Sequence, residues 1–259
     1  MVTERLEQDV AAALETTPEL LPFIPELLAD LWVLGASLDI IVELLGQLGL
    51  PRPTRVLDAG AGKGAVAITL AEQFGFQVLG IDGFQPFVDE ATRQAEARGV
   101  SHLCRFEVGD LRDALPTLQD FDAVIYAALG GILGTVDQCV GLLRRPIRPG
   151  GYLVIDDGFL AGEARMRDRG YESYAPHEET LALLTAHGDE VLREVIIPVE
   201  DIRDTNQQQT ALIRKRAEGL ASRHPDAADS LAQYVERQER ECALLETDVV
   251  GAVWLLRRR

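Results

Sequence analysis

The spacing of apolar residues changes along the chain and divides it into regions of different structure. Residues 1–50 show the three-to-four-residue spacing of amphipathic helices, and SLDIIVELLGQLGL predicts a helix capped by Ser37 and ended by Gly49 and Pro51. From residue 54 onward, short apolar runs alternate with amphipathic stretches, the pattern of alternating strands and helices. The predicted strands are 55–60, 76–82, 103–110, 121–129, 150–158, 190–200 and 248–259.

This alternation predicts an α/β fold with a doubly wound parallel sheet. Residues 201–246 are polar and helical in period, with a break at 224–226, so we expect a helical insertion between the sixth and seventh strands. We therefore expect a single domain overall, with an N-terminal helical annex at 1–50 and a main domain at 51–259 that includes the insertion.

Composition acts mainly by excluding classes of function. The chain of 259 residues carries a net charge of -17, whereas nucleic-acid binding normally requires a basic face, so we expect no nucleic-acid partner. The three cysteines lack metal-ligand or disulfide spacing, which predicts no metal site and fits a reducing cytoplasm. Charged residues interrupt the apolar region 20–50 well before the ~20 residues of a membrane span. We expect a cytoplasmic protein without membrane contact; the oligomeric state stays open.

The stretch VLDAGAGKGA, residues 56–65, is a strand that runs directly into a glycine-rich turn. A P-loop is excluded because no glycine stands five positions before Gly62 and no hydroxyl residue follows Lys63. The dinucleotide pattern Gly-x-Gly-x-x-Gly/Ala does fit Gly60, Gly62 and Ala65. The turn alone therefore leaves a nicotinamide enzyme open.

A third interpretation uses more of the chain. The segment from Asp58 to Gly64 has the form acidic-x-Gly-x-Gly-x-Gly and resembles motif I of the class I S-adenosylmethionine-dependent methyltransferases. Four later stretches resemble further motifs of that family in the same order: GID at 80–82, VGDL at 108–111, FDAVIYAAL at 121–129 and RPGGYLVIDD at 148–157.

Within this family, the chain resembles the broad bacterial small-molecule group related to the quinone-biosynthesis methyltransferases. The resemblance implies a Rossmann-like sheet of seven mostly parallel strands, with helices on both faces and a seventh strand that enters antiparallel beside the sixth. It also implies that the turn binds S-adenosyl-L-methionine and that the product is S-adenosyl-L-homocysteine.

The resemblance assigns cofactor roles to the residues that occupy the motif positions. Asp82 would accept hydrogen bonds from the ribose hydroxyls, and Asp110 would accept one from the adenine amino group. The alternatives are that Asp82 is only a turn residue and that Asp110 only caps a helix. Gly83 stands where an apolar side chain often covers the adenine, so Phe84 or Phe87 is expected to take that role. The implied set is Asp58, Gly60, Ala61, Gly62, Gly64, Asp82, Gly83, Gly109, Asp110, Leu111 and Tyr126. Lys63 is expected to be solvated.

The acceptor site is less well specified. Ligands of doubly wound sheets bind at the carboxyl ends of the strands, where Tyr126, Asp156 and Asp157 stand. The segment RGYESYAPHEET, residues 169–180, could fold over the site and bring His177 or a tyrosine, although His177 also suits a helix start. Trp32 could line a lid or belong to an ordinary core.

These observations favour methyl transfer to a small-molecule acceptor by in-line displacement, in which the protein supplies proximity and orientation. The catalytic residues stay unknown, because a general base is needed only when the acceptor must lose a proton. Two alternatives remain open: an NAD(P)-dependent oxidoreductase, and a non-catalytic cofactor-binding module whose helical insertion binds a partner.

Overall fold

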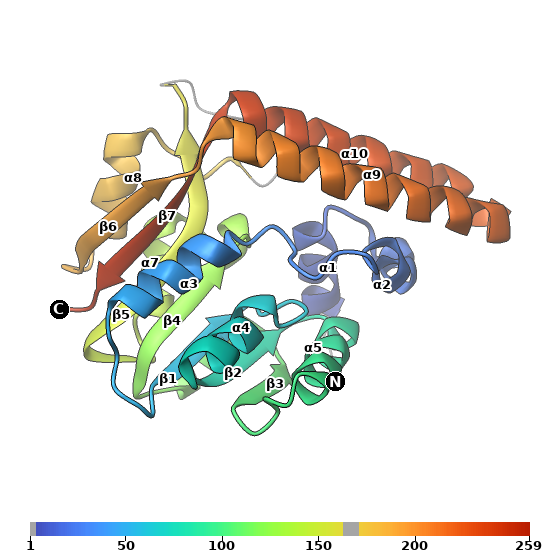
Figure 1. The fold of residues 1–259 in the computed structure, drawn as a ribbon. Coiled ribbons are helices and arrows are strands. Elements are labelled where there is room, and N and C mark those ends of the chain that lie inside the picture. Colours follow the sequence, from blue (N-terminus) through green and yellow to red (C-terminus); the bar gives the residue numbers. More distant parts are fainter. Residues whose placement is uncertain (1–3, 163–170) are drawn as a thin grey trace.

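A computed structural model describes residues 4–162 and 171–259 of the chain. Its centre is a seven-stranded sheet with the strand order β3-β2-β1-β4-β5-β7-β6, which confirms the predicted fold class (Figure 1). Each predicted strand is present, with ends that shift by a few residues. The strands are β1 (Arg55–Ala59), β2 (Gln77–Asp82), β3 (Cys104–Val108), β4 (Phe121–Ala127), β5 (Ile147–Leu160), β6 (Glu190–Ile196) and β7 (Val249–Arg257).

The five strands from β3 to β5 run parallel, and β7 is antiparallel to both of its neighbours, β5 and β6. Parallel order at the centre brings the carboxyl ends of β1, β2 and β4 to one edge of the sheet. Ala59 at the end of β1 pairs with Ile81 on one side and with Tyr126 on the other. The glycine turn that follows Ala59 therefore lies between the ends of β2 and β4.

Alternating side chains build one apolar layer on each face of the sheet. Leu57, Val124 and Ile155 belong to one layer, whereas Val56, Ile125 and Val154 belong to the other. Helices cover the first layer with α6 (Leu111–Ala114), α7 (Val136–Leu143) and α8 (His177–Leu184), and short 3-10 turns η2 (Leu115–Thr117) and η3 (Gly130–Leu133) adjoin them. The opposite face carries α3 (Leu38–Gln47), α4 (Ala65–Phe74) and α5 (Gln85–Ala97).

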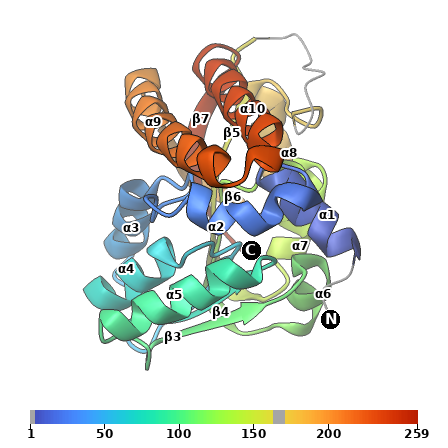
Figure 2. The ribbon, with the colours of Figure 1, turned by 90° about the vertical axis from the view of Figure 1, so that its right-hand side faces the viewer.

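The N-terminal helices pack between the sheet and a long helical hairpin (Figure 2). Buried residues such as Leu20, Ile24, Leu220 and Tyr234 form one apolar cluster that also includes Phe87 of α5. The elements that meet here are α1 (Glu4–Ala13), η1 (Pro18–Phe23), α2 (Ile24–Leu27), α9 (Val199–Arg223), η4 (Pro225–Ala227) and α10 (Ala228–Thr247). None of the helices in the described ranges is long and apolar enough to cross a membrane.

One predicted helix cap has a different role in the structure. Ser37 does stand at the start of α3, but its side chain makes no capping bond to that helix. Instead, its backbone N–H and its hydroxyl donate to the Asp156 carboxylate, at 2.5 and 3.1 Å. Ser37 therefore ties the N-terminal segment to the end of β5. The division into an annex, a main domain and an insertion stays a prediction.

Two carboxyl groups meet where α1 ends against α10. Glu15 is hydrogen-bonded to Glu241, and Gln238 donates to Glu15 Oε2 at 3.1 Å. Burial and the neighbouring Glu241 raise the pKa of Glu15 to about 9. The folded chain therefore holds a proton on this pair at neutral pH.

The burial of the core predicts that the same isoleucine-to-alanine change has different effects on stability at two positions. Ile41 is fully buried between α3 and the sheet, whereas Ile196 on the edge strand is 45% exposed. Ile41→Ala should lower the free energy of unfolding by about 2–5 kcal/mol, and Ile196→Ala by no more than about 0.5 kcal/mol. Chemical denaturation of both variants measures the difference. Equal losses would contradict this assignment of the core.

The carboxyl pair predicts a pH-dependent stability. Because the pKa of Glu15 is raised on folding, its stabilising contribution is full below the unfolded pKa and is lost as pH rises toward about 9. Glu15→Gln should remove this decline, so that the variant gains stability relative to wild type between pH 5 and 9. Thermal melts across that range provide the measurement, with the exposed Glu200→Gln as the matched control. A parallel pH dependence in Glu15→Gln and wild type would refute the shared proton.

Candidate active site

The turn after β1 has a backbone that only glycine adopts readily. Gly60, Gly62 and Gly64 have φ angles of 88°, 51° and 80°, in the left-handed region. The N–H groups of Gly60 and Ala61 donate to the Ile81 carbonyl at 2.8 and 3.1 Å. The turn is thereby fixed to the end of β2 before α4 begins.

Packing explains part of the glycine pattern. A Cβ at Gly64 would lie 2.9 Å from both Ala91 and Phe106, so this glycine lets α4 approach α5 and β3. A Cβ at Gly60 would lie 2.1 Å from a methyl of Leu129, which follows β4. The space above the Gly60 backbone is therefore taken by Leu129 in this structure, and a ligand reaching that backbone requires Leu129 to turn away.

Asp82 does more than a plain turn residue. Its Oδ2 accepts from Gly62 N–H at 2.8 Å, and its Oδ1 accepts from Phe84 N–H at 2.9 Å. Burial raises the pKa of Asp82, although these two backbone hydrogen bonds oppose the rise. The carboxylate thus connects the glycine turn to the end of β2.

Asp58 is buried with an unsatisfied oxygen. The residue is 3% exposed, and within the described ranges its Oδ2 has no hydrogen-bond partner. Burial raises the pKa of Asp58 to about 7, against a hydrogen bond from the Ala67 backbone. A buried oxygen without a partner is costly, so this position is suited to a ligand group or an ordered water.

Asp110 caps α6, as its alternative interpretation predicted. Its Oδ1 accepts from the backbone N–H and from Nε of Arg112, at 2.9 and 3.0 Å, and Leu111 beside it is buried. Burial opposes ionisation of Asp110, but Arg112 outweighs it and lowers the pKa. Arg112 also pairs with Asp9 of α1. Gly109, just before Asp110, donates its N–H to the Asp82 carbonyl at 3.0 Å.

Helix α1 covers the position of Gly83. A Cβ at Gly83 would lie 2.8 Å from Val10 and 3.1 Å from Leu6, both on α1. Phe84 and Phe87 pack edge-to-face, 4.9 Å apart, within the N-terminal cluster. The apolar side chains above position 83 therefore come from a helix distant in sequence.

Lys63 corrects the expectation of a solvated side chain. It is only 6% exposed, because its Nζ reaches the carbonyls of Leu28 and Leu31, the latter at 2.7 Å. Burial lowers the pKa of Lys63 to about 8. The glycine turn is thereby attached to the chain that follows α2.

Tyr126 and Asp157 come together on the face covered by α7. A small pocket there is lined by both residues, by Cys139 and by Tyr174. The Tyr126 hydroxyl donates to the Gly130 carbonyl at 2.8 Å. Asp157 Oδ1 accepts from Gly158 N–H at 2.9 Å and from the Tyr174 hydroxyl.

The other three acceptor candidates lie elsewhere. Asp156 points to the opposite face, where Ser37 holds its carboxylate, and burial raises its pKa to about 6. Trp32 packs near α4 and α5 under the Arg98 guanidinium, 3.9 Å from the ring centre. His177 begins α8 and contacts Glu194 of β6 at 2.8 Å. Of the expected covering segment, residues 169 and 170 lie outside the described residues.

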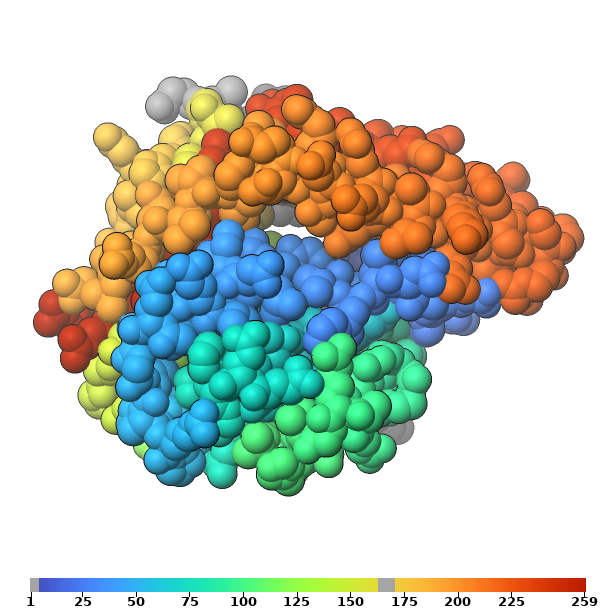
Figure 3. Space-filling model, viewed as in Figure 1, coloured from blue at the N-terminus to red at the C-terminus, as the bar shows by residue number. Residues whose placement is uncertain are grey.

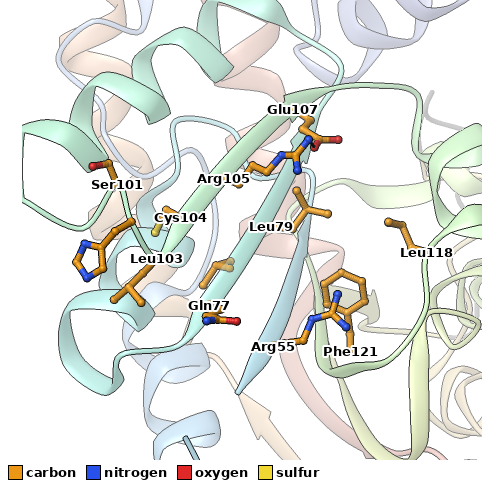
Figure 4. A pocket seen from close by; sticks show the side chains of 12 residues that line it. Arg55, Gln77, Leu79, Ser101, Leu103, Cys104, Arg105, Glu107, Leu118 and Phe121 are labelled. Carbon is orange, nitrogen blue, oxygen red and sulfur yellow. Dashed lines mark ion pairs between the residues drawn. The ribbon is translucent and has the colours of Figure 1, made fainter. Parts of the chain in front are cut away.

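A larger hollow lies at the opposite, amino-terminal end of the strands (Figure 4). Its lining includes Arg55 and Gln77, which begin β1 and β2, together with His102 and Phe121. Ligands of doubly wound sheets bind at the other end of the strands. This hollow is therefore separate from the glycine turn.

Comparison with known proteins gives a consistent result for the central part of the chain. Residues 56–151 match the methyltransferase domain family. A tRNA 5-carboxymethoxyuridine methyltransferase of Escherichia coli is 34% identical over 122 residues, which cover 47% of this chain and 45% of that protein. A demethylmenaquinone methyltransferase of Thermus thermophilus is 38% identical over 105 residues, 40% of this chain and 46% of that protein. The chain thus spans less than half the length of these relatives.

A solved structure extends the likeness to nearly the whole fold. The S-adenosylmethionine-dependent methyltransferase from Geobacter sulfurreducens, in complex with S-adenosyl-L-homocysteine, has a TM-score of 0.77 at 23% identity and covers 92% of this chain and 98% of its own.

The sheet order, the antiparallel β7 and the glycine turn between β1 and α4 define a Rossmann-like methyltransferase fold. The match over residues 56–151 lies within this fold and includes the glycine turn, so the central part of the chain resembles the methyltransferase domain family.

The buried lysine predicts a local effect. Lys63→Met should remove both hydrogen bonds to the chain after α2, lower the free energy of unfolding by about 1–3 kcal/mol, and raise amide hydrogen exchange in residues 24–36. Lys215 lies exposed on α9, so Lys215→Met is the control and should leave both quantities unchanged. Unaltered exchange in Lys63→Met would argue against the attachment.

Proposed function

We propose that this protein transfers the methyl group of S-adenosyl-L-methionine to a small-molecule acceptor. The observation that carries the proposal is the junction of the glycine turn with the Asp82 carboxylate at the end of β2, inside the segment that matches the methyltransferase domain family. The nicotinamide and non-catalytic alternatives gain no support from the comparisons.

The residues at the turn fit this cofactor. Asp82 would hold the ribose hydroxyls, which are hydrogen-bond donors matched to a carboxylate. The unsatisfied Asp58 oxygen, with the adjoining turn of Gly60 to Gly64, would face the ammonium and carboxylate of the methionine end. When bound, S-adenosylmethionine supplies a methyl group activated by a sulfonium.

The adenine end would lie between the β2 and β3 ends. There, Asp110 and the Leu111 backbone would meet the ring edge, beside Gly83 and Gly109. Leu6 and Val10 of α1 would cover the ring in place of a side chain at position 83. We include Ala61 and Tyr126 in the proposed contact set, because the first belongs to the turn and the second ends the neighbouring strand.

The protein's own contribution would be to orient the reactants and exclude water. The attachment of Lys63 to the carbonyls after α2, and that of Ser37 to Asp156, hold the N-terminal segment beside the glycine turn. We propose that this annex and the α9–α10 insertion cap the acceptor site. Figure 3 shows an opening between α9 and the N-terminal part of the chain.

The acceptor is proposed to be a small molecule. One relative acts on tRNA by its name, but the net charge of -17 here opposes contact with a phosphate backbone. Tyr126 and Asp157 are the proposed acceptor residues, whereas Trp32 and His177 lie away from their pocket. We further propose a cytoplasmic location, consistent with the cysteine content.

Calorimetry with S-adenosyl-L-homocysteine tests the proposal. Wild-type protein should bind it, and Asp82→Asn should weaken binding about 10- to 100-fold, because a hydrogen bond to a charged group contributes about 1.5–3 kcal/mol. The exposed Asp89→Asn serves as the control and should bind as wild type does.

Two outcomes would count against this function. Absence of heat at millimolar ligand would reject the cofactor, and enhanced NADH fluorescence on mixing would favour an oxidoreductase. Full affinity in Asp82→Asn would reject only the ribose assignment.

A further inference from the structure

The pocket beside Tyr126 has a chemical composition that limits what it can bind. Its twelve lining residues include two tyrosines, one cysteine and one aspartate, and neither lysine, arginine nor histidine lines it in the described ranges. An anionic acceptor such as a carboxylate or phosphate would face Asp157 with no cation among the described lining residues to offset the repulsion. A neutral or cationic molecule would meet no such repulsion.

The pocket also lies close to the proposed cofactor turn. Tyr126 lines it and pairs in register with Ala59, the residue directly before Gly60. Ala128, two residues further along, has a φ of 54°, an uncommon conformation for a residue with a Cβ. Such backbone strain concentrates at functional sites, which agrees with a reactive position at the end of β4.

Asp157 has one carboxylate oxygen that accepts no hydrogen bond from the described residues. Both of its hydrogen bonds, from Gly158 N–H and from the Tyr174 hydroxyl, end on Oδ1. The residue is half-buried and borders the pocket. Within the described ranges this leaves Oδ2 as the oxygen that a molecule in the pocket would meet.

We propose that Asp157 is the proton acceptor for the methyl acceptor molecule, that Tyr174 positions it, and that this molecule is neutral or cationic with an O–H or N–H group. This inference rests on the proposed function. In the step, the acceptor O–H or N–H proton passes to Asp157 Oδ2, and the electron pair left on oxygen or nitrogen forms the bond to the methyl carbon. The carbon–sulfur bond breaks with its pair on sulfur, giving the neutral thioether, and Asp157 then returns the proton to solvent.

The electrostatics agree with this role. Burial raises the pKa of Asp157 to about 6, against the hydrogen bonds of Tyr174 and Gly158, so the carboxylate is ionised at neutral pH yet basic enough to take a proton. Among the described residues, the other titratable groups that interact with Asp157 or with Tyr174 are Tyr126 from β4, Cys139 from α7, Asp156 from β5, Tyr171, and Glu241 of α10, which accepts from the Tyr171 hydroxyl at 2.7 Å. Burial raises the pKa of both Tyr126 and Cys139, so these two stay neutral.

The first test measures binding at Asp157 directly. Protein labelled with ¹³C at aspartate carboxyls and saturated with S-adenosyl-L-homocysteine is titrated with catechol, benzylamine, benzoate and phenyl phosphate, and the Asp157 resonance is assigned from Asp157→Asn. Catechol or benzylamine should shift this resonance, and the two anions should not. The proposal is overturned if the Asp157 resonance shifts with neither catechol nor benzylamine, or if it shifts equally with the two anions.

The second test measures methyl transfer from labelled S-adenosylmethionine to the probe that binds. Asp157→Asn should lower kcat about 100-fold or more, with little change in KM and unchanged affinity for S-adenosyl-L-homocysteine. Tyr174→Phe removes a hydrogen bond that lowers the pKa of Asp157, so the acidic limb of its pH–rate profile should move to higher pH. The exposed Asp226→Asn is the control and should behave as wild type does.

The outcomes separate the two proposals. Loss of S-adenosyl-L-homocysteine binding in wild type defeats the methyltransferase function itself. Intact binding with full kcat in Asp157→Asn, or with an unmoved limb in Tyr174→Phe, defeats only the role of this pair.

Discussion

The arrangement of the carboxyl edge of the sheet depends on the hydrogen bond from Gly62 N–H to Asp82 Oδ2. It joins a left-handed turn to the end of the neighbouring strand, and the Ile81 carbonyl reinforces the join by accepting from Gly60 and Ala61. Because parallel strands end at one edge, fixing this turn beside β2 also fixes it beside β4. The pocket at Tyr126 therefore stands one strand away from the glycine turn.

A second constraint comes from chain segments remote in sequence. Val10 of α1 lies above Gly83, and Lys63 extends from the turn to the carbonyls of Leu28 and Leu31. The lysine gives up hydration to make these contacts, which is why its pKa falls. The N-terminal helices consequently form part of the wall of the candidate site, and their packing on α9 and α10 links that wall to the insertion.

The sheet could be predicted from the sequence because its signals are local. Strand period, proline and glycine stops and the motif order together identify each strand and the class of fold. Asp82 and Asp110 could also be singled out from the sequence, because the first ends a strand and the second caps a helix. The Asp110 carboxylate caps α6 and also lies at the end of β3. Its role as a helix cap is therefore compatible with the proposed role in binding the cofactor.

Other features depend on contacts between distant segments, which periodicity does not encode. To predict that Lys63 is buried, one must know that residues 28–31 cross the turn. To predict that Trp32 lies away from Tyr126, one must know which helices each residue contacts. Asp156 and Asp157 are adjacent in sequence, yet strand alternation sends them to opposite faces, one to Ser37 and one to Tyr174. That alternation was a usable signal, and it would have separated the two residues from the sequence alone.

The central claim is that the glycine turn and the Asp82 carboxylate form the S-adenosylmethionine site. A crystal structure of the protein grown with S-adenosyl-L-homocysteine tests it most directly. The account predicts that the ribose hydroxyls lie within hydrogen-bond distance of Asp82, that the amino-acid end lies along Gly60 to Gly64, and that Leu129 has turned away from Gly60. Ligand bound in the hollow at Arg55 and Gln77, or elsewhere with Leu129 still seated on Gly60, would contradict it.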